Sequence, residues 1–570
     1  MKVEKVNLIA CPLDCYDACQ GQMIEDNIKG SKENLVTNGK LCVNFANLLK
    51  VENLQTAFYE NKEISLDESL NILIEKLKST TPAKTLFYKG SGNLGVMQNS
   101  TKNFFTQYGS TLTRGSLCDG GGNVAFEEGR GIVINPPIQK LLDADIVVVW
   151  GRNLTVTSSH MYNLIKDKTF VTIDPIKTEI AKKSKIHMQL NPKTDYELAL
   201  LFTRFAYMQD LEDREFIEEY GNGADWFFDI SRNRPVVSYE ATTGIELSKV
   251  NEFFDLIENK KVAILVGLGV QKYFEGTQIM RCIDSFAAFM GYHKKDAGGV
   301  WYLSNSATGY ENQFEVKGTN KKVSIPKVDF GSYDLVFIQG ANPVVSHPNT
   351  KKVIEGLKNS FVVYFGTTYN ETCEYANLII PSTSFLSKKD VRLSYGHEFK
   401  SISNMVKEKT QNSISEYDLA NFLLEEFDFK KLKSEDEIIS YYENHKPDLE
   451  DFETFNFIEE VDIEPLYKEK TSENFYFITA KNKNSLNSQF ANDNFVYLNS
   501  KTNFKNEDKV TISSKYGSAE FIVKIDDDIK EDCAFFYAGN KNVNYLTPND
   551  EDESSFSVMY QEVLVEIELS

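Results

Sequence analysis

The chain has no apolar run long enough to cross a membrane, because no stretch approaches about 18 uncharged hydrophobic residues. Its first residues, MKVEKVNLIACPLDC, contain neither the apolar core of a signal peptide nor a pair of adjacent arginines. These absences predict a cytoplasmic protein with no direct membrane insertion.

Basic residues are also scarce. The 62 Lys and Arg are outnumbered by 83 Asp and Glu, which leaves a formal net charge of −21. This charge repels the phosphates of nucleic acids, so we expect no nucleic-acid partner. Hydrophobic residues make up 41% of the 570 residues, enough for several packed cores, and the length predicts about four domains.

Cysteine is rare, but its distribution is uneven. Eight cysteines in 570 residues are too few for a disulfide scaffold, and four of them lie within the first 42 residues: Cys11, Cys15, Cys19 and Cys42. A [4Fe-4S] cluster needs four converging thiolates and suits this C-x3-C-x3-C-x22-C spacing. Structural zinc, which usually takes two closely spaced cysteine pairs, and unliganded thiols are the alternatives.

The central part of the chain alternates apolar strands with helix-forming segments. Continuous apolar runs with Gly, Asn or Asp near their ends predict parallel, doubly wound sheets, whose ligands bind beyond the carboxyl ends of the strands. The runs are at 85–90, 143–153, 170–175, 262–269, 334–342 and 361–366.

Two of these units resemble each other. IVVVWGRN followed by TSSH is similar to LVFIQGAN followed by VSH, and both place Gly-x-Asn directly after an apolar strand. The repeat predicts two related ligand sites, or it reflects only the pattern that any two strand–helix units share. From about residue 474, short alternating strands and turns predict a C-terminal β-barrel-like domain.

The cysteine motif and the segments after it resemble the molybdopterin oxidoreductases of the dimethyl sulfoxide reductase family. The similar segments occur in the family's order: CPLDCYDAC, GKLC, GSLCDGGG, WGRN, IDPIKTEIA, NPKTD, GLGVQ, QGANP, NETCEYANLIIP and VNYLTP. The resemblance implies an α/β multidomain fold with an N-terminal iron–sulfur domain, two Rossmann-like doubly wound α/β domains and a C-terminal β-barrel-like domain. We expect these domains at 1–58, 59–140 with 331–473, 141–330 and 474–570.

The resemblance also implies cofactors and site residues. A molybdenum or tungsten ion on two molybdopterin guanine dinucleotides would lie between the Rossmann-like domains, and the four N-terminal cysteines would hold the [4Fe-4S] cluster. Cys118 stands where relatives carry a metal ligand, and a soft thiolate suits that metal; its alternative role is packing. Asp119 is expected to cap the following helix, with proton transfer near the metal as the alternative role. Cofactor contacts are expected at Gly151, Asn153, Asp174, Asp195, Gly269, Asn342 and Thr372.

These features predict an iron–sulfur molybdoenzyme that performs two-electron redox chemistry on a small-molecule substrate, with a ferredoxin-like or iron–sulfur protein as electron-transfer partner. One departure is Asn44, because relatives commonly have Lys two residues after the fourth cysteine. Two other functions stay open. One is a non-catalytic electron-transfer subunit resembling the large iron–sulfur subunit of respiratory complex I, and the other is a redox-neutral hydratase or hydroxyl transferase on the same cofactor.

Overall fold

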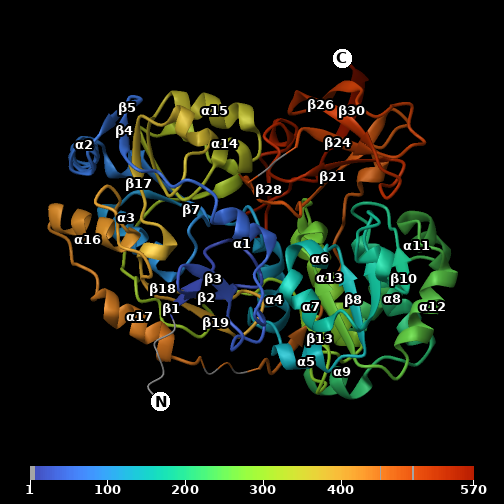
Figure 1. Cartoon of the computed structure of the whole chain (residues 1–570). Helices are drawn as coiled ribbons and strands as arrows, with labels where there is room; N and C mark the ends of the chain where they lie inside the picture. The colour runs from blue at the N-terminus through green and yellow to red at the C-terminus, as the bar shows by residue number, and fades with distance from the viewer. Residues whose placement is uncertain (1–6, 448, 450, 491–492) are drawn as a thin grey trace.

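The computed structural model describes residues 7–447, 449, 451–490 and 493–570. Figure 1 shows two lobes of sheets and helices side by side, a small N-terminal sheet between them and a barrel above. The predicted α/β multidomain fold with a C-terminal barrel is confirmed. In the described part of the chain, no helix is long and apolar enough to cross a bilayer.

The N-terminal part is a three-stranded antiparallel sheet whose first loop carries three cysteines. The backbone N–H of Cys11 donates to the carbonyl of Cys19 over 2.9 Å, which closes that loop. Cys42 precedes the short helix that follows the sheet. The elements are β1 (Asn7–Ala10), β2 (Gln20–Ile24), β3 (Asn27–Gly30) and α1 (Val43–Leu48).

The left lobe in Figure 1 is built on an eight-stranded sheet in the order β14-β7-β6-β15-β16-β17-β4-β5, parallel except at β4 and β5. Alternate residues of its strands enter two cores: Phe337 packs with α2, α3 and α16, while Ile338 packs with α14 and α15. Because both faces are covered, the strands read as continuous apolar runs.

The strands of this lobe are β4 (Ala57–Tyr59), β5 (Lys62–Ile64), β6 (Thr85–Lys89), β7 (Thr111–Arg114), β14 (Lys322–Ser324), β15 (Leu335–Gln339), β16 (Phe361–Gly366) and β17 (Leu378–Pro381). Its helices are α2 (Leu66–Ser79), α3 (Ser100–Tyr108), α14 (Pro343–Ser346), α15 (Thr350–Lys358), α16 (Glu416–Glu426) and α17 (Glu435–Asn444). The hairpin β18 (Asp390–Leu393) and β19 (Lys400–Ser403) packs against β1.

The right lobe contains a parallel five-stranded sheet in the order β10-β9-β8-β12-β13. The strands are β8 (Ile146–Trp150), β9 (Thr169–Ile173), β10 (Ile186–Met188), β12 (Val262–Val266) and β13 (Gly299–Trp301). One face packs against helices that include α8 (Asp195–Met208), α12 (Leu247–Ile257) and α13 (Gly276–Phe289), and the other against α5 (Ile138–Leu142) and α7 (Ser159–Ile165).

Shorter elements complete this lobe: α4 (Gly120–Arg130), α6 (Leu154–Thr157), α9 (Arg214–Tyr220), α10 (Ala224–Arg232), α11 (Val236–Thr243), β11 (Gly221–Asn222) and β20 (Phe455–Asn456). α4 follows Cys118 and packs against α13. This packing fixes the start of α4, and therefore Cys118, relative to the sheet.

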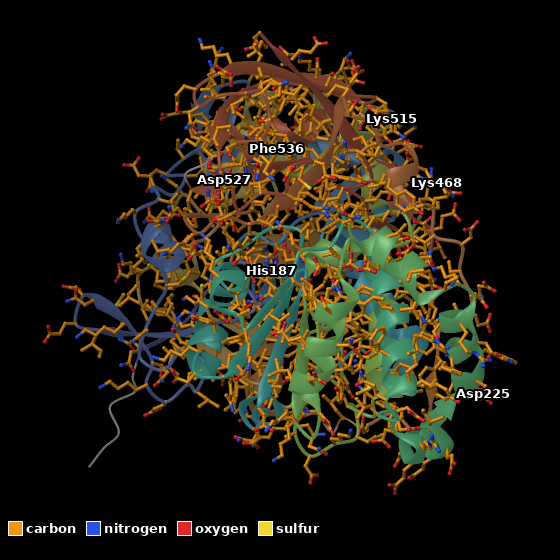
Figure 2. The ribbon with its side chains drawn as sticks, turned by 90° about the vertical axis from the view of Figure 1, so that its right-hand side faces the viewer. His187, Asp225, Lys468, Lys515, Asp527 and Phe536 are labelled. Atoms are coloured by element: carbon orange, nitrogen blue, oxygen red, sulfur yellow. The ribbon has the colours of Figure 1, made fainter. Side chains whose placement is uncertain are left out.

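The C-terminal part is a closed six-stranded barrel. Its strands are β21 (Asn474–Ala480), β24 (Phe495–Leu498), β25 (Lys509–Ser514), β26 (Gly517–Ile525), β27 (Cys533–Tyr537) and β30 (Leu564–Leu569), with the short pairs β22 (Ser485–Leu486) with β23 (Gln489–Phe490) and β28 (Glu551–Asp552) with β29 (Ser557–Val558) outside it. Figure 2 shows the barrel, with Phe536, above the five-stranded sheet, with His187. The backbone N–H of Lys177 donates to the carbonyl of Asp528 across this boundary over 2.9 Å.

Candidate functional site

One cavity of about 1340 Å³ lies where all four parts of the molecule meet. Loops after β6, β15 and β16 line it from one sheet, and loops after β8, β9 and β12 line it from the other. The cysteine loop and the barrel complete the wall. Because the carboxyl ends of both parallel sheets face this space, it is where doubly wound folds bind their ligands.

The cavity brings together eleven of the twelve predicted site residues: Cys11, Cys15, Cys19, Cys42, Cys118, Gly151, Asn153, Asp174, Asp195, Gly269 and Asn342. Thr372 is the exception, because it is fully buried and does not line the cavity. Its hydroxyl donates to the side-chain oxygen of Asn342 over 2.9 Å. The expected direct contact is therefore not met at Thr372, which instead positions Asn342.

The two sheets present matching glycine turns to the cavity. Gly151 follows β8 with a φ of +56°, and Gly340 follows β15 with a φ of +54°, a backbone region that favours glycine. The N–H of Gly269 donates to the carbonyl of Gly151 over 3.3 Å, and the N–H of Gly92 donates to that of Gly340 over 2.8 Å. The repeat seen in the sequence therefore corresponds to a repeated turn geometry.

Acidic side chains stand near both turns. Burial raises the pKa of Asp174 and of Asp195 to about 7, and Trp150 donates from its indole to the Asp195 carboxylate over 2.7 Å. In the other half, the Glu371 carboxylate accepts from Asn342 over 2.8 Å. The sequence analysis missed Glu371, although it lies in the NETCEY segment next to Thr372. Carboxylates at these places can accept hydrogen bonds from a base or ribose.

The four N-terminal cysteines line one end of the cavity. Burial raises the pKa of Cys11 to about 12 and places those of Cys15 and Cys19 well above their usual value. Thiols of this kind ionise when a metal centre binds them. Among the described residues, no group of three or more Cys, His, Asp or Glu side chains is arranged to hold a single metal ion.

Histidines and Asp17 hold the cysteine loop. His160 Nδ1 lies 3.4 Å from the sulfur of Cys19 and 3.0 Å from the carboxylate of Asp17. Burial lowers the pKa of His160, but Asp17 outweighs burial and raises it overall. His397 Nε2 lies 3.0 Å from the Asp17 carbonyl, whereas His347 contacts carbonyls of its own lobe. His160 and His397 therefore orient the loop through Asp17, which is buried.

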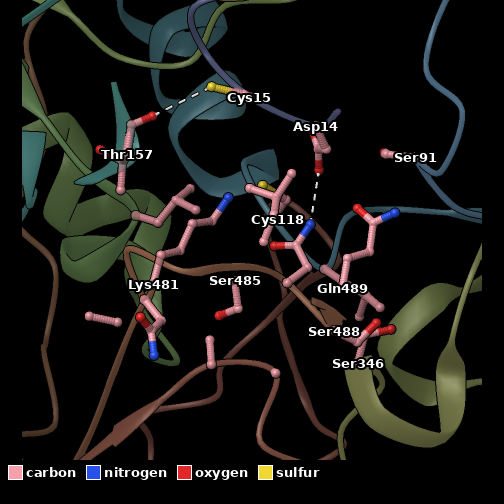
Figure 3. A pocket seen from close by; sticks show the side chains of 18 of the residues that line it. Asp14, Cys15, Ser91, Cys118, Thr157, Ser346, Lys481, Ser485, Ser488 and Gln489 are labelled. Carbon is pink, nitrogen blue, oxygen red and sulfur yellow. Dashed lines mark hydrogen bonds between the residues drawn. The ribbon is translucent and has the colours of Figure 1, made fainter. Parts of the chain in front are cut away.

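Cys118 lies in the wall of the same cavity, beside two lysines that the sequence analysis missed. Burial, followed by Asp119 and Asp14, raises the pKa of Cys118 to about 12. Lys272 donates to the Cys118 carbonyl over 3.0 Å, and burial lowers its pKa to about 8. Lys481 extends into the cavity from the end of β21, toward Cys15 and Cys118 (Figure 3). Lys272 could have been identified from the sequence, because it directly follows the GLGVQ segment, whereas no nearby motif points to Lys481.

Asp119 differs from its predicted role. It occupies the position before α4, but its side chain makes no capping bond to the helix backbone. Its carboxylate accepts from the side chains of Ser116 and Asn123 over 3.0 and 3.2 Å. Asp119 and Tyr395 also border a second cavity of about 250 Å³, so their side chains face both spaces.

A comparison with known protein families identifies the family to which this chain belongs. Residues 60–425 match the family described as molybdopterin oxidoreductase, which is more than half of the chain. The chain belongs to the molybdopterin oxidoreductase family. Residues 475–564 match a molybdopterin dinucleotide-binding domain, which includes most of the barrel. The molybdopterin oxidoreductase described here is therefore an enzyme whose expected cofactor is a molybdenum or tungsten pterin.

Similar proteins belong to the same family, as the sequence resemblance predicted. The chain is 23% identical over 483 residues to the probable oxidoreductase YoaE of Bacillus subtilis, covering 75% of this chain and 70% of YoaE. It is 21% identical over 422 residues to trimethylamine-N-oxide reductase 1 of Escherichia coli, covering 60% of this chain and half of that protein. The fold matches acetylene hydratase from Pelobacter acetylenicus with a TM-score of 0.82 and 15% identity, covering 99% of this chain and 100% of the hydratase.

Proposed function

We propose that this molybdopterin oxidoreductase performs two-electron redox chemistry on a small molecule at a molybdenum or tungsten ion held by two pterin guanine dinucleotides. The observation that carries the proposal is that Cys118 and two matching glycine turns line the same cavity. Each turn would receive one dinucleotide, and the thiolate of Cys118 would bind the metal.

The residues present fit two dinucleotides. At Gly340, a Cβ atom would lie 2.7 Å from the carbonyl oxygen of Gly92, and at Gly151 it would lie 2.7 Å from the Val270 side chain. Only glycine allows these backbone segments to lie so close together beside the ligand space. Asp174 and Asp195 would bind one nucleotide, and Asn342 with Glu371 would bind the other.

The cysteine loop fits a [4Fe-4S] cluster better than zinc. Structural zinc usually takes two closely spaced cysteine pairs, whereas three of these four thiols lie in or next to the loop between β1 and β2 and the fourth follows in Cys42. In a cubane, each of the four thiolates binds a different iron, which suits this spacing. We therefore propose that Cys11, Cys15, Cys19 and Cys42 hold the cluster, through which electrons pass to or from a ferredoxin-like or iron–sulfur partner.

The bound metal would supply the two-electron exchange with substrate. The chain's own residues position it and control its surroundings. Lys272 donates to the carbonyls of Leu117 and Cys118 over 3.2 and 3.0 Å, which fixes the loop that presents the thiol. Lys272 and Lys481 add positive charge near Cys118, while residues of the barrel line one side of the cavity.

The first experiment is elemental analysis of anaerobically purified protein for iron, molybdenum, tungsten and zinc, with acid-released guanine nucleotide measured on the same sample. We expect about four iron atoms and one molybdenum or tungsten ion per chain, together with guanine nucleotide. Iron without molybdenum, tungsten or nucleotide, in protein from cells able to assemble the cofactor, would instead indicate an electron-transfer subunit. Zinc without iron would overturn the cluster assignment.

Turnover separates redox chemistry from hydration. Reduced methyl viologen should be oxidised in the presence of trimethylamine N-oxide or another oxidised small molecule from a panel. Acetylene consumed without any electron acceptor or donor would instead indicate a redox-neutral enzyme. The Cys15→Ser variant should lose the broad visible absorbance of the cluster, whereas Cys533→Ser, in the barrel, should retain it. Equal absorbance in both variants would reject Cys15 as a cluster ligand.

A further inference from the structure

The buried Lys and Arg side chains of the described residues divide into two groups. Three have carboxylate partners and do not themselves line the main cavity: Arg130 with Asp284, Lys193 with Glu275 and Glu562, and Lys388 with Glu416 and Asp390. The other three line the cavity and form no ion pair with a described carboxylate: Arg152, Lys272 and Arg392. A buried cation without an anion is destabilised, so an anion bound in the cavity would stabilise these side chains.

Arg392 is the member of this second group that hydrogen-bonds to a cysteine of the N-terminal loop. It lies on β18 and is 2% exposed. One terminal nitrogen donates to the carbonyl of Cys15 over 3.1 Å, and the other donates to the carbonyl of Leu393. Its Nε is buried and has no hydrogen-bond partner. The guanidinium therefore lies beside the cysteines with one donor unused.

The surroundings of Arg392 contain little other charge to balance it. Asp17, one of the two carboxylates of the cysteine loop, is already paired with His160 over 3.0 Å. Asp14 accepts from the hydroxyl of Tyr395, on whose ring face the Arg392 guanidinium lies at 5.4 Å. The thiolates of a cluster bound by this loop would be the anionic partner of Arg392, which already donates to the carbonyl of Cys15.

We propose that Arg392 is the cation that balances the cysteine-bound cluster and raises its reduction potential, at a place where the helix after Cys42 provides only uncharged Asn44. This proposal rests on the [4Fe-4S] assignment made above. Arg392 acts as a positioning residue, because it contacts the backbone of the cysteine loop and is not a cluster ligand. It lies on β18, more than 300 residues after Cys15 in the sequence. Asn44 lines the same cavity as Arg392, its side-chain oxygen is buried without a partner, and its amide carries no charge.

The sign of the effect follows from electrostatics. One-electron reduction by dithionite adds one negative charge to a cluster that is already negative, and no bond forms or breaks. Arg392 keeps its proton throughout, because guanidinium does not titrate in this range. Its attraction to the cluster is therefore stronger in the reduced state, which raises the potential. Arg152 also lies beside the cysteine loop, over the ring of Tyr16 at 4.2 Å, but its hydrogen bond goes to Ser158, whereas that of Arg392 goes to the Cys15 carbonyl.

The test is a dithionite titration of the purified holoenzyme with redox mediators, in which the electron paramagnetic resonance signal of the reduced cluster is followed. Three variants are compared with the wild type. Arg392→Gln removes the charge, Arg392→Lys retains it, and Lys389→Gln removes an equivalent charge next to β18. Lys389 is a matched control because it is 43% exposed and pairs with Asp436 at the surface, where solvent screens it.

We expect the midpoint potential to fall in Arg392→Gln, to recover most of the difference in Arg392→Lys and to stay unchanged in Lys389→Gln. If Arg392→Gln loses its iron while Arg392→Lys keeps it, the charge is required for cluster retention, which also supports the proposal. An unchanged potential in iron-loaded Arg392→Gln would overturn it, as would equal iron loss in both Arg392 variants. Absence of a cluster from the wild type would instead reject the proposed function on which this inference rests.

Discussion

Trp150 and Asp195 are joined by a hydrogen bond of 2.7 Å from the indole nitrogen to the carboxylate, at the end of β8 and the start of α8. Trp150 is fully buried, and Asp195 lines the cavity. A rigid aromatic donor therefore orients a carboxylate proposed to bind nucleotide, and this pair links the core of the five-stranded sheet to the site.

Replacing Trp150 with Phe should weaken nucleotide retention. The variant loses a buried hydrogen bond worth about 1 kcal/mol and frees the Asp195 side chain. Guanine nucleotide released by acid should therefore fall relative to the wild type. Trp301→Phe is the matched control, since its indole donates to the Pro136 carbonyl over 3.0 Å away from the cavity. Equal nucleotide content in the two variants would show that nucleotide binding does not depend on the orientation of Asp195 by Trp150.

Replacing Gly340 with Ala should disturb the second turn more than an ordinary glycine substitution. A Cβ atom there would lie 2.7 Å from the Gly92 carbonyl, whereas at Gly131, also at positive φ, nothing lies within 4 Å. Both variants should lose about 1 kcal/mol of unfolding free energy from the left-handed backbone. Only Gly340→Ala should also lose bound nucleotide. Full nucleotide retention in Gly340→Ala would contradict the assignment of this turn.

Replacing Cys118 with Ala should change the metal centre and leave the cluster intact. The electron paramagnetic resonance signal of molybdenum or tungsten should shift, and turnover should fall by at least about 100-fold because a metal ligand is lost. Iron content should stay at the wild-type level. Cys373→Ala provides the control, since Cys373 is buried in a hydrophobic core outside the cavity. Persistence of both signal and activity would demote Cys118 to a packing role.

The buried pair of Asp284 and Arg130 should make stability depend on pH in the acid range. Burial opposes ionisation of Asp284, but Arg130 and His293 outweigh it and lower the pKa to about 2, below the usual 3.8. The stabilisation that ionised Asp284 gives the folded state is therefore complete above its usual pKa of 3.8, and it is lost as the pH falls toward about 2. Asp284→Asn should cost about 3 to 5 kcal/mol near neutral pH, because Arg130 stays buried and charged.

Urea unfolding followed by tryptophan fluorescence measures the difference in unfolding free energy between wild type and Asp284→Asn. This difference should become smaller as the pH is lowered below about 4. Asp229→Asn is the control, since Asp229 pairs with Arg232 at the surface and is 57% exposed. It should cost less than about 1 kcal/mol at any pH. A pH-independent difference between wild type and Asp284→Asn would show that packing, not charge, accounts for the loss.

The sequence determined the features that depend on local order. Apolar runs such as 334–342 predicted parallel strands because both faces of each sheet are covered by helices. The spacing of the N-terminal cysteines predicted one shared loop, and Gly151 and Gly340 were identified because their turns follow the strands directly. The predicted domain boundaries and the cytoplasmic location stay predictions.

Tertiary structure alone decided which side chains meet across long separations. Arg392 contacts the Cys15 carbonyl, Lys481 enters the cavity from the barrel, and Thr372 lies behind Asn342 rather than beside the ligand space. Local patterns report which face of an element is apolar, but the partner of a buried polar group depends on how distant elements pack. The sequence therefore determined the elements and the cysteine loop, while the fold decided the charges that surround them.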